Sequence, residues 1–218
     1  MWFNGRAGQE VADFRIERSL LNKGFKDIVG IDEAGRGALF GPVVAASVIF
    51  ADDFIRYCRE KWVSEINDSK LIAPPKREML AKAILVTAKS VGIGMATNRE
   101  IDQNDIGWAS SEAMKRALRR MPCRPDCLLV DGFQLTGVNY HQLWLHHGDR
   151  RSISIAAASI VAKVLRDKMI EHLDKIFEGY VFSKHKGYGT RDHLVILKEK
   201  GPTEFHRFSF RPLNKGKQ

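Results

Sequence analysis

Two adjacent carboxylates, Asp32 and Glu33, stand where an apolar stretch near the start of the chain ends. Residues 28–31 precede the pair, and a Gly-Arg-Gly turn at residues 35–37 follows it. Neighbouring anions repel each other and lose hydration on burial, so they need a cation between them unless solvent covers them. Oxygen ligands favour Mg²⁺ or Mn²⁺ over Zn²⁺. The pair therefore indicates either a divalent metal site or, more simply, a surface turn with two solvated acids.

Two further acids follow short apolar stretches later in the chain. Asp131 comes directly after residues 127–130, and Asp149 comes shortly after the weaker stretch 142–145. Taken singly, Asp131 and its following glycine are typical of a turn, and Asp149 is typical of a helix N-cap or first turn. If the apolar stretches are neighbouring strands, however, their ends bring four carboxylates together. Such a cluster can hold two metal ions that activate a water and stabilise the leaving oxygen of a phosphodiester.

The overall charge favours a polyanionic partner for this site. Lysine and arginine number 35 against 26 acids, which gives a net charge of +9. A basic balance of this kind favours nucleic acid first and an anionic membrane surface second. Together, a two-metal site and a basic surface predict a metal-dependent nuclease.

The elements that must position the acids alternate between helices and strands, which predicts one α/β domain with a mixed sheet. Residues 51–74 look irregular, and the chain beyond residue 180 is a polar, basic tail. The predicted helices are residues 9–23, 75–89, 106–120 and 152–177, and the predicted strands are residues 28–31, the run that ends at Phe50, and residues 90–96, 127–130 and 142–145.

The cysteines and the apolar runs indicate in which cellular compartment the protein lies. Cys58, Cys123 and Cys127 are too few for a secreted disulfide framework and indicate a reducing compartment. Cys123 and Cys127 lack a second ligand pair nearby, so we expect no zinc site. The N-terminus lacks the apolar core of a signal peptide, and no apolar run reaches the roughly 20 residues of a membrane span. These features predict a cytoplasmic protein that does not associate with membranes.

The segment IVGIDEAGRGALFGPVVAASVIF resembles the signature of the type 2 ribonucleases H, specifically bacterial ribonuclease HII. The resemblance covers about residues 27–212 in the family's order, and it continues through NDSKLIAPPKREML, ATNREIDQNDIGWASSEAM, LLVDGF, GDRRSISIAAASIVAKVLRD, HKGYGT and GPTEFHRFSF. It implies an RNase H-like α/β fold: a mixed five-stranded sheet flanked by helices, with its first three strands antiparallel, plus a helical C-terminal part. The division it implies is an N-terminal helix (1–24), a catalytic domain with a helical substrate-binding part (25–213) and a basic tail (214–218).

The resemblance also implies an activity. The family's catalytic carboxylates match Asp32, Glu33, Asp131 and Asp149, which would hold two Mg²⁺ or Mn²⁺ ions. The implied reaction is hydrolysis on the 5′ side of a ribonucleotide, which leaves 3′-hydroxyl and 5′-phosphate ends. The implied substrates are RNA–DNA hybrids and DNA duplexes that contain single ribonucleotides.

Recognition of such substrates depends on the 2′-hydroxyl, the group that separates RNA from DNA. The resemblance assigns this task to Gly35, Arg36 and Gly37, where glycine lets the backbone approach the sugar. It assigns to Tyr188 the stacking on the deoxyribose that follows the ribonucleotide. Further expected substrate contacts are Arg151, Ser152 and Lys186, and weaker candidates for phosphate contacts are Lys163, Arg166 and Lys184. His206 is open between a structural and a substrate role, and Asp167 is expected to be an ion-pair partner next to Arg166.

Two residues depart from the family pattern: Ala38 where proline is common after the turn, and His147 where lysine is common. Ala38 is expected only to relax the turn. His147 replaces a permanent cation with a side chain of the type that titrates near neutrality. We therefore expect cleavage to depend on pH more than is usual in the family, unless Arg150 and Arg151 supply the missing charge.

Two other functions compete with this interpretation. A nucleic-acid-binding module without chemistry would gain nothing from four clustered acids. A ribonuclease HIII carries an extra N-terminal substrate-binding domain, for which the 26 residues before Asp27 are too short. We expect a monomer, and the sequence does not reveal whether a sliding clamp is a partner.

Overall fold

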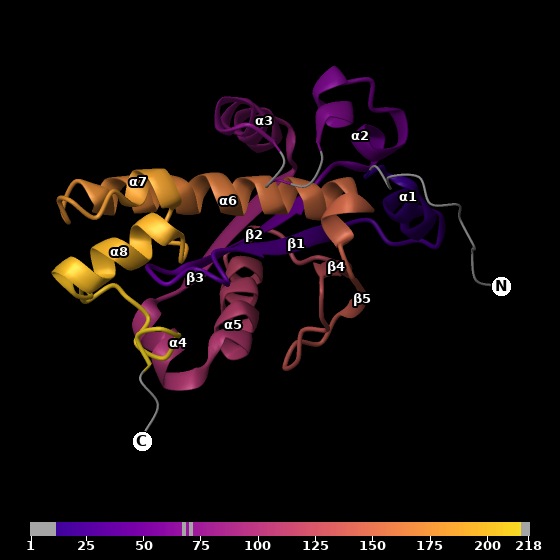
Figure 1. Cartoon of the computed structure of the whole chain (residues 1–218). Helices are drawn as coiled ribbons and strands as arrows, with labels where there is room; N and C mark the ends of the chain where they lie inside the picture. Colours follow the sequence, from indigo (N-terminus) through magenta and orange to yellow (C-terminus); the bar gives the residue numbers. More distant parts are fainter. Residues whose placement is uncertain (1–11, 67–68, 70–71, 215–218) are drawn as a thin grey trace, which may run out of the picture.

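The computed structural model describes residues 12–66, 69 and 72–214, and within them a five-stranded sheet forms the centre of the molecule (Figure 1). The strand order is β3-β2-β1-β4-β5. β1 pairs antiparallel with β2, and β2 with β3, whereas β4 pairs parallel with β1 and β5 parallel with β4. The predicted mixed sheet, with its first three strands antiparallel, is confirmed. The strands are β1 (Ile28–Ala34), β2 (Val43–Ile49), β3 (Ser90–Ala96), β4 (Cys127–Asp131) and β5 (His141–Leu145).

Burial explains why some strands are easy to find in the sequence and one is not. Every residue of β2 is buried, and so is every residue of β1 except Glu33. Strands covered on both faces have near-continuous apolar sequences of this kind. β5 lies at the edge of the sheet and exposes Leu143 and Trp144, so its sequence pattern is weak.

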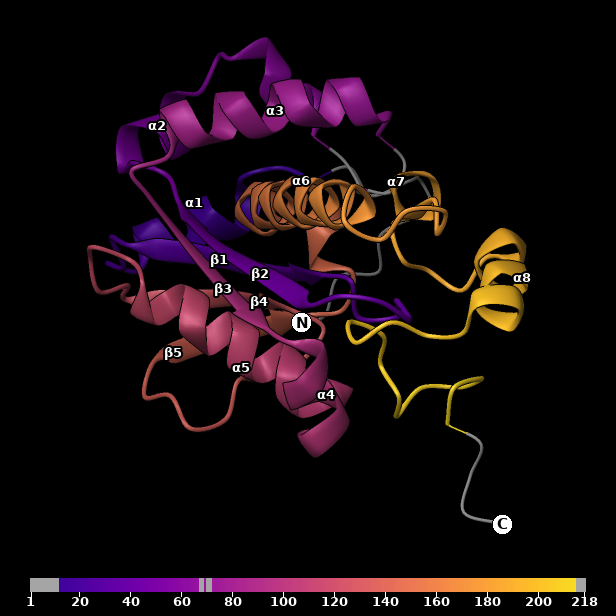
Figure 2. The same ribbon diagram turned by 90° about the vertical axis from the view of Figure 1, so that its left-hand side faces the viewer.

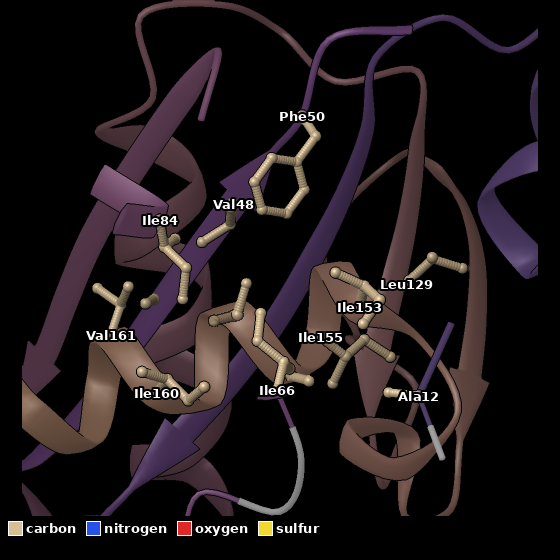
Figure 3. Close-up of a cluster of buried hydrophobic side chains, with 14 of the residues drawn as sticks. Ala12, Val48, Phe50, Ile66, Ile84, Leu129, Ile153, Ile155, Ile160 and Val161 are labelled. Atoms are coloured by element: carbon tan, nitrogen blue, oxygen red, sulfur yellow. The ribbon is translucent and has the colours of Figure 1, made fainter. Parts of the chain in front are cut away.

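Helices cover both faces of the sheet. The long helix α6 (Ile153–Asp174) packs on one face, with α3 (Pro74–Thr87) beyond it, and α5 (Ile106–Arg119) packs on the other (Figure 2). Val48, Ile84 and Val161 belong to the apolar core on the α6 side (Figure 3). This arrangement holds β1, the central strand of the sheet, between two layers of helices.

Glycines let these helices approach the sheet closely. A Cβ atom at Gly30 of β1 would lie 2.0 Å from the backbone carbon of Ser154, and one at Gly94 of β3 would lie 2.1 Å from the carbonyl oxygen of Ala113. Real Cβ atoms are not found so close to backbone atoms, so α6 and α5 rest directly on strand backbone at these two positions.

The N-terminal helix is shorter than predicted. α1 spans Arg15–Asn22, and Phe14 precedes it with its ring packed edge-on against Phe50 and Phe54. The helix was predicted from residue 9, and residues 1–11 of the predicted N-terminal segment lie outside the described residues. The predicted helices at 75–89, 106–120 and 152–177 are confirmed to within three residues at each end.

Short helices occupy segments that look irregular in the sequence. The region after Phe50 contains α2 (Asp52–Tyr57) and the 3-10 turn η1 (Lys61–Glu65), and α4 (Asn98–Asn104) precedes α5. The apparently polar tail contains α7 (Phe182–His185) and α8 (Arg191–Lys200), which confirms the helical C-terminal part. These helices have one to three turns, too few to establish a clear apolar periodicity.

No helix of the described part is long and apolar enough to cross a membrane. Cys58, Cys123 and Cys127 are all free thiols, and burial raises the pKa of Cys127 to about 11.

Candidate active site

Strand register brings the four predicted carboxylates to one cleft. Ile31 of β1 pairs with Val130 of β4, so Asp32 and Asp131 follow on neighbouring parallel strands. β4 pairs in turn with β5, and the 3-10 turn η2 (Gly148–Arg150) just beyond β5 carries Asp149. The cleft has a volume of about 640 Å³ and is lined by Asp32, Glu33, Ala34, Gly35, Arg36, Gly37, Ser69, Asp131, Gly132, Phe133, His147, Asp149, Arg150, Ser159, Lys163 and Tyr188.

Asp32 and Glu33 are held in surroundings that disfavour their charge. Burial raises the pKa of Asp32 well above its ordinary value, and the negative charges of Glu33 and Asp131 raise it further. Burial also raises the pKa of Glu33, although the guanidinium of Arg36, 3.5 Å away, opposes this shift. The Oε2 atom of Glu33 is buried and has no hydrogen-bond partner among the described residues.

The local backbone fixes the orientation of these acids. The amide of Glu33 donates to Oδ1 of Asp32 over 2.6 Å, and the amide of Gly148 donates to Oδ1 of Asp131 over 2.6 Å. The second bond ties the end of β4 to the turn that carries Asp149. Two acids from distant parts of the sequence, Asp32 and Asp131, are thus held by short bonds from backbone amides.

These features fit a divalent cation. Buried carboxylates that repel one another, one with an unpartnered oxygen, are costly unless a positive charge shares the site. The donor atoms are carboxylate oxygens, which suit Mg²⁺ or Mn²⁺. Across the described residues, no three His, Cys, Asp or Glu side chains form a ready-made metal cage.

The Gly-Arg-Gly turn forms one wall of the cleft. Gly35 has a φ of +93°, and a Cβ atom there would lie 1.9 Å from Nε of Arg166, so only glycine fits. Gly37 faces open space. The guanidinium of Arg36 lies 5.7 Å from the centre of the Phe133 ring, a distance at which the ring attracts a cation.

Tyr188 forms the neighbouring wall. An isolated antiparallel bridge joins Ala38 to Tyr188, so the turn at 35–37 and the tyrosine belong to adjacent pieces of backbone. The Lys163 ammonium lies 5.2 Å from the centre of the tyrosine ring, and the Arg166 guanidinium lies 5.3 Å from it. Two cations therefore support the ring from α6.

Three of the predicted substrate contacts lie elsewhere. Ser152 is fully buried, caps α6 by accepting from the amide of Ile155, and donates to Glu17 over 2.6 Å, so its hydroxyl is not available to a substrate. Lys186 pairs with Glu171 through its ammonium. Arg151 is exposed but does not line the cleft, whereas its neighbour Arg150 does.

Of the weaker candidates for substrate contacts, some line the cleft and others do not. Lys163 lines the cleft, but Arg166 is fully buried and cannot contact a phosphate. Lys184 pairs with Asp192 at the surface. His206 is buried and hydrogen-bonded inside the C-terminal part, which supports its structural role.

Asp167 is an ion-pair partner as predicted, but not of Arg166. It pairs with Lys163 over 2.7 Å and with Arg77 over 3.3 Å. It therefore helps to hold the one predicted lysine of α6 that faces the cleft.

Sequence reasoning missed two serines of the cleft. Ser69 and Ser159 lie 3.0 Å apart, and Ser159 hydrogen-bonds to Asp32. Ser159 ends a run of three alanines on α6, and a lone hydroxyl in such a run was a usable signal. Ser69 stands in a polar loop whose sequence contains nothing that separates it from its neighbours.

Comparison with known proteins gives consistent results. A family model described as ribonuclease HII matches residues 29–213. The ribonuclease HII of Caldicellulosiruptor bescii is 41% identical over 205 residues, which cover 94% of this chain and 96% of that relative. The ribonuclease HII of Lactobacillus delbrueckii subsp. bulgaricus is 45% identical over 201 residues, which cover 92% and 75%.

Solved structures share the fold. The Archaeoglobus fulgidus ribonuclease HII, described in complex with PCNA, has a TM-score of 0.70 and 26% identity, and the match covers 85% of this chain and 95% of that chain. The Bst ribonuclease HIII, described in complex with Mn²⁺, has a TM-score of 0.63 and 17% identity, with coverages of 87% and 68%. At this lower identity the likeness establishes the fold alone.

Proposed function

The chain belongs to the ribonuclease HII family of ribonuclease H hydrolases, and from this premise we propose that it cleaves RNA–DNA hybrids and nicks DNA duplexes on the 5′ side of single embedded ribonucleotides. The observation that carries the proposal is the cleft itself. Four carboxylates line it together with the Gly-Arg-Gly turn and Tyr188, so a site for hydrolysis adjoins two elements suited to a ribose. We propose that the chain acts as a monomer, because the cleft is built from residues of a single copy.

Asp32, Glu33, Asp131 and Asp149 would hold two Mg²⁺ or Mn²⁺ ions. Such ions supply a water of lowered pKa and stabilise charge on the phosphodiester oxygens. The protein contributes rigidity, because the amides of Glu33 and Gly148 fix two of the carboxylates before substrate binds. The Mn²⁺ complex named for a ribonuclease HIII of the same fold makes manganese the second metal to test.

The two walls of the cleft would select the substrate. Gly37 faces open space, so the backbone of the turn can approach a 2′-hydroxyl without obstruction. The Tyr188 ring, supported by Lys163, would stack on the deoxyribose that follows. A substrate that satisfies both walls contains an RNA-to-DNA junction directly after the ribonucleotide whose 5′ side is cleaved.

The first experiment compares three duplexes: DNA with one ribonucleotide, a long RNA–DNA hybrid, and DNA alone. Each is incubated with Mg²⁺ or Mn²⁺ and with the wild type, Asp131→Asn and the control Asp53→Asn, whose carboxylate is exposed on α2 away from the cleft. We expect a single metal-dependent nick 5′ of the ribonucleotide and no cleavage of DNA alone. Asp131→Asn should lose at least about 100-fold in rate, as is typical when a group that stabilises the transition state is removed.

Each other outcome has a distinct meaning. Cleavage of the long hybrid alone would be consistent with the proposed metal site. It would contradict the junction-reading role of Gly35–Gly37 and Tyr188. Tight duplex binding without cleavage by either metal would favour a non-catalytic binding protein. Equal losses of cleavage rate in Asp131→Asn and Asp53→Asn would contradict the assignment of Asp131 as a catalytic carboxylate.

A further inference from the structure

The segment 203–207, which follows α8, is connected by hydrogen bonds to both walls of the cleft although it carries none of the carboxylates. Figure 2 shows this part of the chain passing the connection between β1 and β2. The amide of Gly41 donates to Phe205 over 2.9 Å, and the amide of Arg207 donates to Leu39 over 2.8 Å. On its other side, the amide of Leu39 donates to Gly187 over 2.8 Å. Residues 39–41 therefore run between the segment 203–207 and the backbone next to Tyr188.

Arg207 adds a side-chain connection to the Gly-Arg-Gly turn. Its side chain is fully buried. Its Nη1 atom donates to the carbonyl oxygen of Arg36 over 2.9 Å, and its Nε atom donates to that of Gly41 over 3.0 Å. A guanidinium is planar and presents donors in a fixed fork, so one side chain sets the spacing between these two carbonyls.

The surroundings of Arg207 are unfavourable for a charge. Burial lowers the pKa of Arg207 to about 9, and the nearby positive charge of Arg166 contributes to the shift. The Nη2 atom is buried without a hydrogen-bond partner in the described part of the chain. Burying a cation in this way costs stability. The two carbonyl contacts, together with the Phe210 ring, whose centre lies 5.2 Å from the guanidinium, offset part of this cost.

The same segment also reaches the backbone of Tyr188 through two histidines. The amide of Thr203 donates to Nδ1 of His206 over 2.9 Å, so that ring carries its proton on Nε2. The proton-bearing Nε2 of His206 then donates to Nε2 of His193 over 3.1 Å. The Nδ1 atom of His193 donates in turn to the carbonyl oxygen of Tyr188 over 2.9 Å. Residues 203–207 are thus bonded, directly or through His193, to a backbone carbonyl in each wall.

We propose that Arg207 is a positioning residue for ribonucleotide recognition, because it fixes the Arg36 carbonyl and thereby the place of the Gly-Arg-Gly backbone relative to Tyr188. This inference rests on the proposed function. A junction substrate must satisfy both walls at once, so it depends on their relative position. A long RNA strand presents no deoxyribose to Tyr188 and depends on the turn alone. Weakening the connection should therefore reduce cleavage at a single ribonucleotide more than cleavage of a long hybrid.

The test measures kcat and KM on both substrates for the wild type, Arg207→Lys, Arg207→Gln and Arg59→Gln. Lysine keeps the charge but cannot span both carbonyls, and Arg59 is an exposed arginine remote from the cleft. We expect Arg207→Gln to lower the ratio of kcat/KM on the single ribonucleotide to kcat/KM on the hybrid about tenfold, mainly through kcat, as unpaired buried carbonyls let the turn move. Arg207→Lys should fall between Arg207→Gln and the wild type, and Arg59→Gln should keep the wild-type ratio.

Thermal unfolding of each variant separates positioning from general loss of structure. If a folded Arg207 variant loses kcat/KM equally on the two substrates, the inference is wrong. If neither Arg207 variant folds, His206→Asn decides, because the asparagine oxygen can still accept from Thr203 while the shorter side chain does not reach His193. An unchanged substrate ratio in that variant would overturn the inference too. If the wild type does not nick at a single ribonucleotide, both the proposed function and this inference are wrong.

Discussion

The acids of the cleft lie close to one another, and the folded chain by itself does not neutralise their negative charge. Asp32 is buried beside Glu33 and Asp131, and each neighbour disfavours its ionised form. Arg36 relieves Glu33 only in part, since burial still raises the pKa of that side chain. Stability and function are therefore opposed at these positions, as is common where a site must hold a ligand of opposite charge.

Asp32→Asn tests this opposition through pH. The folded wild type keeps a proton on Asp32 at pH values where the unfolded chain has released it, because the pKa is raised in the fold. Its stability without metal therefore falls as pH rises from the ordinary carboxyl pKa through the raised value. We expect metal-free Asp32→Asn to be more stable than the wild type at about pH 8, with a smaller gap at about pH 5.

The measurement is thermal unfolding in a chelating buffer across this pH range, with Asp53→Asn as the matched control. Parallel curves for the wild type and Asp32→Asn would contradict the prediction. Adding Mg²⁺ should stabilise the wild type and not Asp32→Asn, because only a folded site with its carboxylates intact binds the ion.

His147 gives a second residue-level prediction. It lines the cleft in the left-handed conformation, with a φ of 53°, and its side chain is exposed. Histidine loses its charge near neutrality and lysine does not. The ratio of the His147→Lys rate to the wild-type rate should therefore rise a few-fold between about pH 6 and pH 8, and pH–rate profiles of both proteins measure it. If the pH–rate profiles of the two proteins superimpose, the positive charge that the reaction needs comes from Arg150 or another residue.

At the scale of elements, the site depends on how closely α6 approaches β1. β1 supplies Asp32 and Glu33, and α6 supplies Ser159 and Lys163 to the same cleft. Gly30 is where the two elements touch, and the backbone of Ser154 leaves no room there for a side chain. The small residues at 156–159 of α6 extend this close approach along the helix.

Gly30→Ala should therefore destabilise the protein far more than Gly37→Ala. The first substitution forces α6 away from the sheet and should cost more than about 3 kcal/mol in free energy of unfolding, at or above the upper range for overpacked cores. The second meets no atom within 4 Å, so its effect on stability should stay within about 0.5 kcal/mol. Denaturant unfolding compares the two, and equal losses would contradict the role given to the contact at Gly30.

At the scale of the whole molecule, a basic protein carries a cleft of acids. The net charge is +9, yet four carboxylates meet at the cleft. The excess of positive charge attracts the phosphates of a duplex from a distance, while metal ions would compensate the acids locally. Duplex binding should therefore depend on salt more strongly than the chemical step does.

Steady-state kinetics at increasing salt test this expectation. KM for the duplex should rise at least about tenfold between 50 and 200 mM salt, with a much smaller change in kcat, because each phosphate contact releases counterions. Lys163→Met should lower the slope of log KM against log salt by about 1 if this lysine contacts a phosphate. A slope equal to that of the wild type would leave Lys163 its contacts with the Tyr188 ring and Asp167 but no phosphate contact.

The sequence by itself determined the residue types and local patterns of the site. Apolar stretches before Asp32 and Asp131 located β1 and β4, since strand burial leaves a direct mark on composition, whereas the exposed β5 before Asp149 left only a weak one. The glycines of the turn likewise indicated a close approach of the backbone to a ligand. These features are local in the chain, so the order of residues is enough to find them.

Tertiary structure alone decided which charged and polar residues face the cleft. Lys163 and Arg166 stand three residues apart on one helix, yet Lys163 lines the cleft while Arg166 is buried against the carbonyls of Phe40 and Pro42. Ser152 looks like a substrate contact in sequence and is a buried helix cap. Arg207 meets a carbonyl 171 residues away. Such contacts are set by strand order and helix packing, which no local spacing encodes.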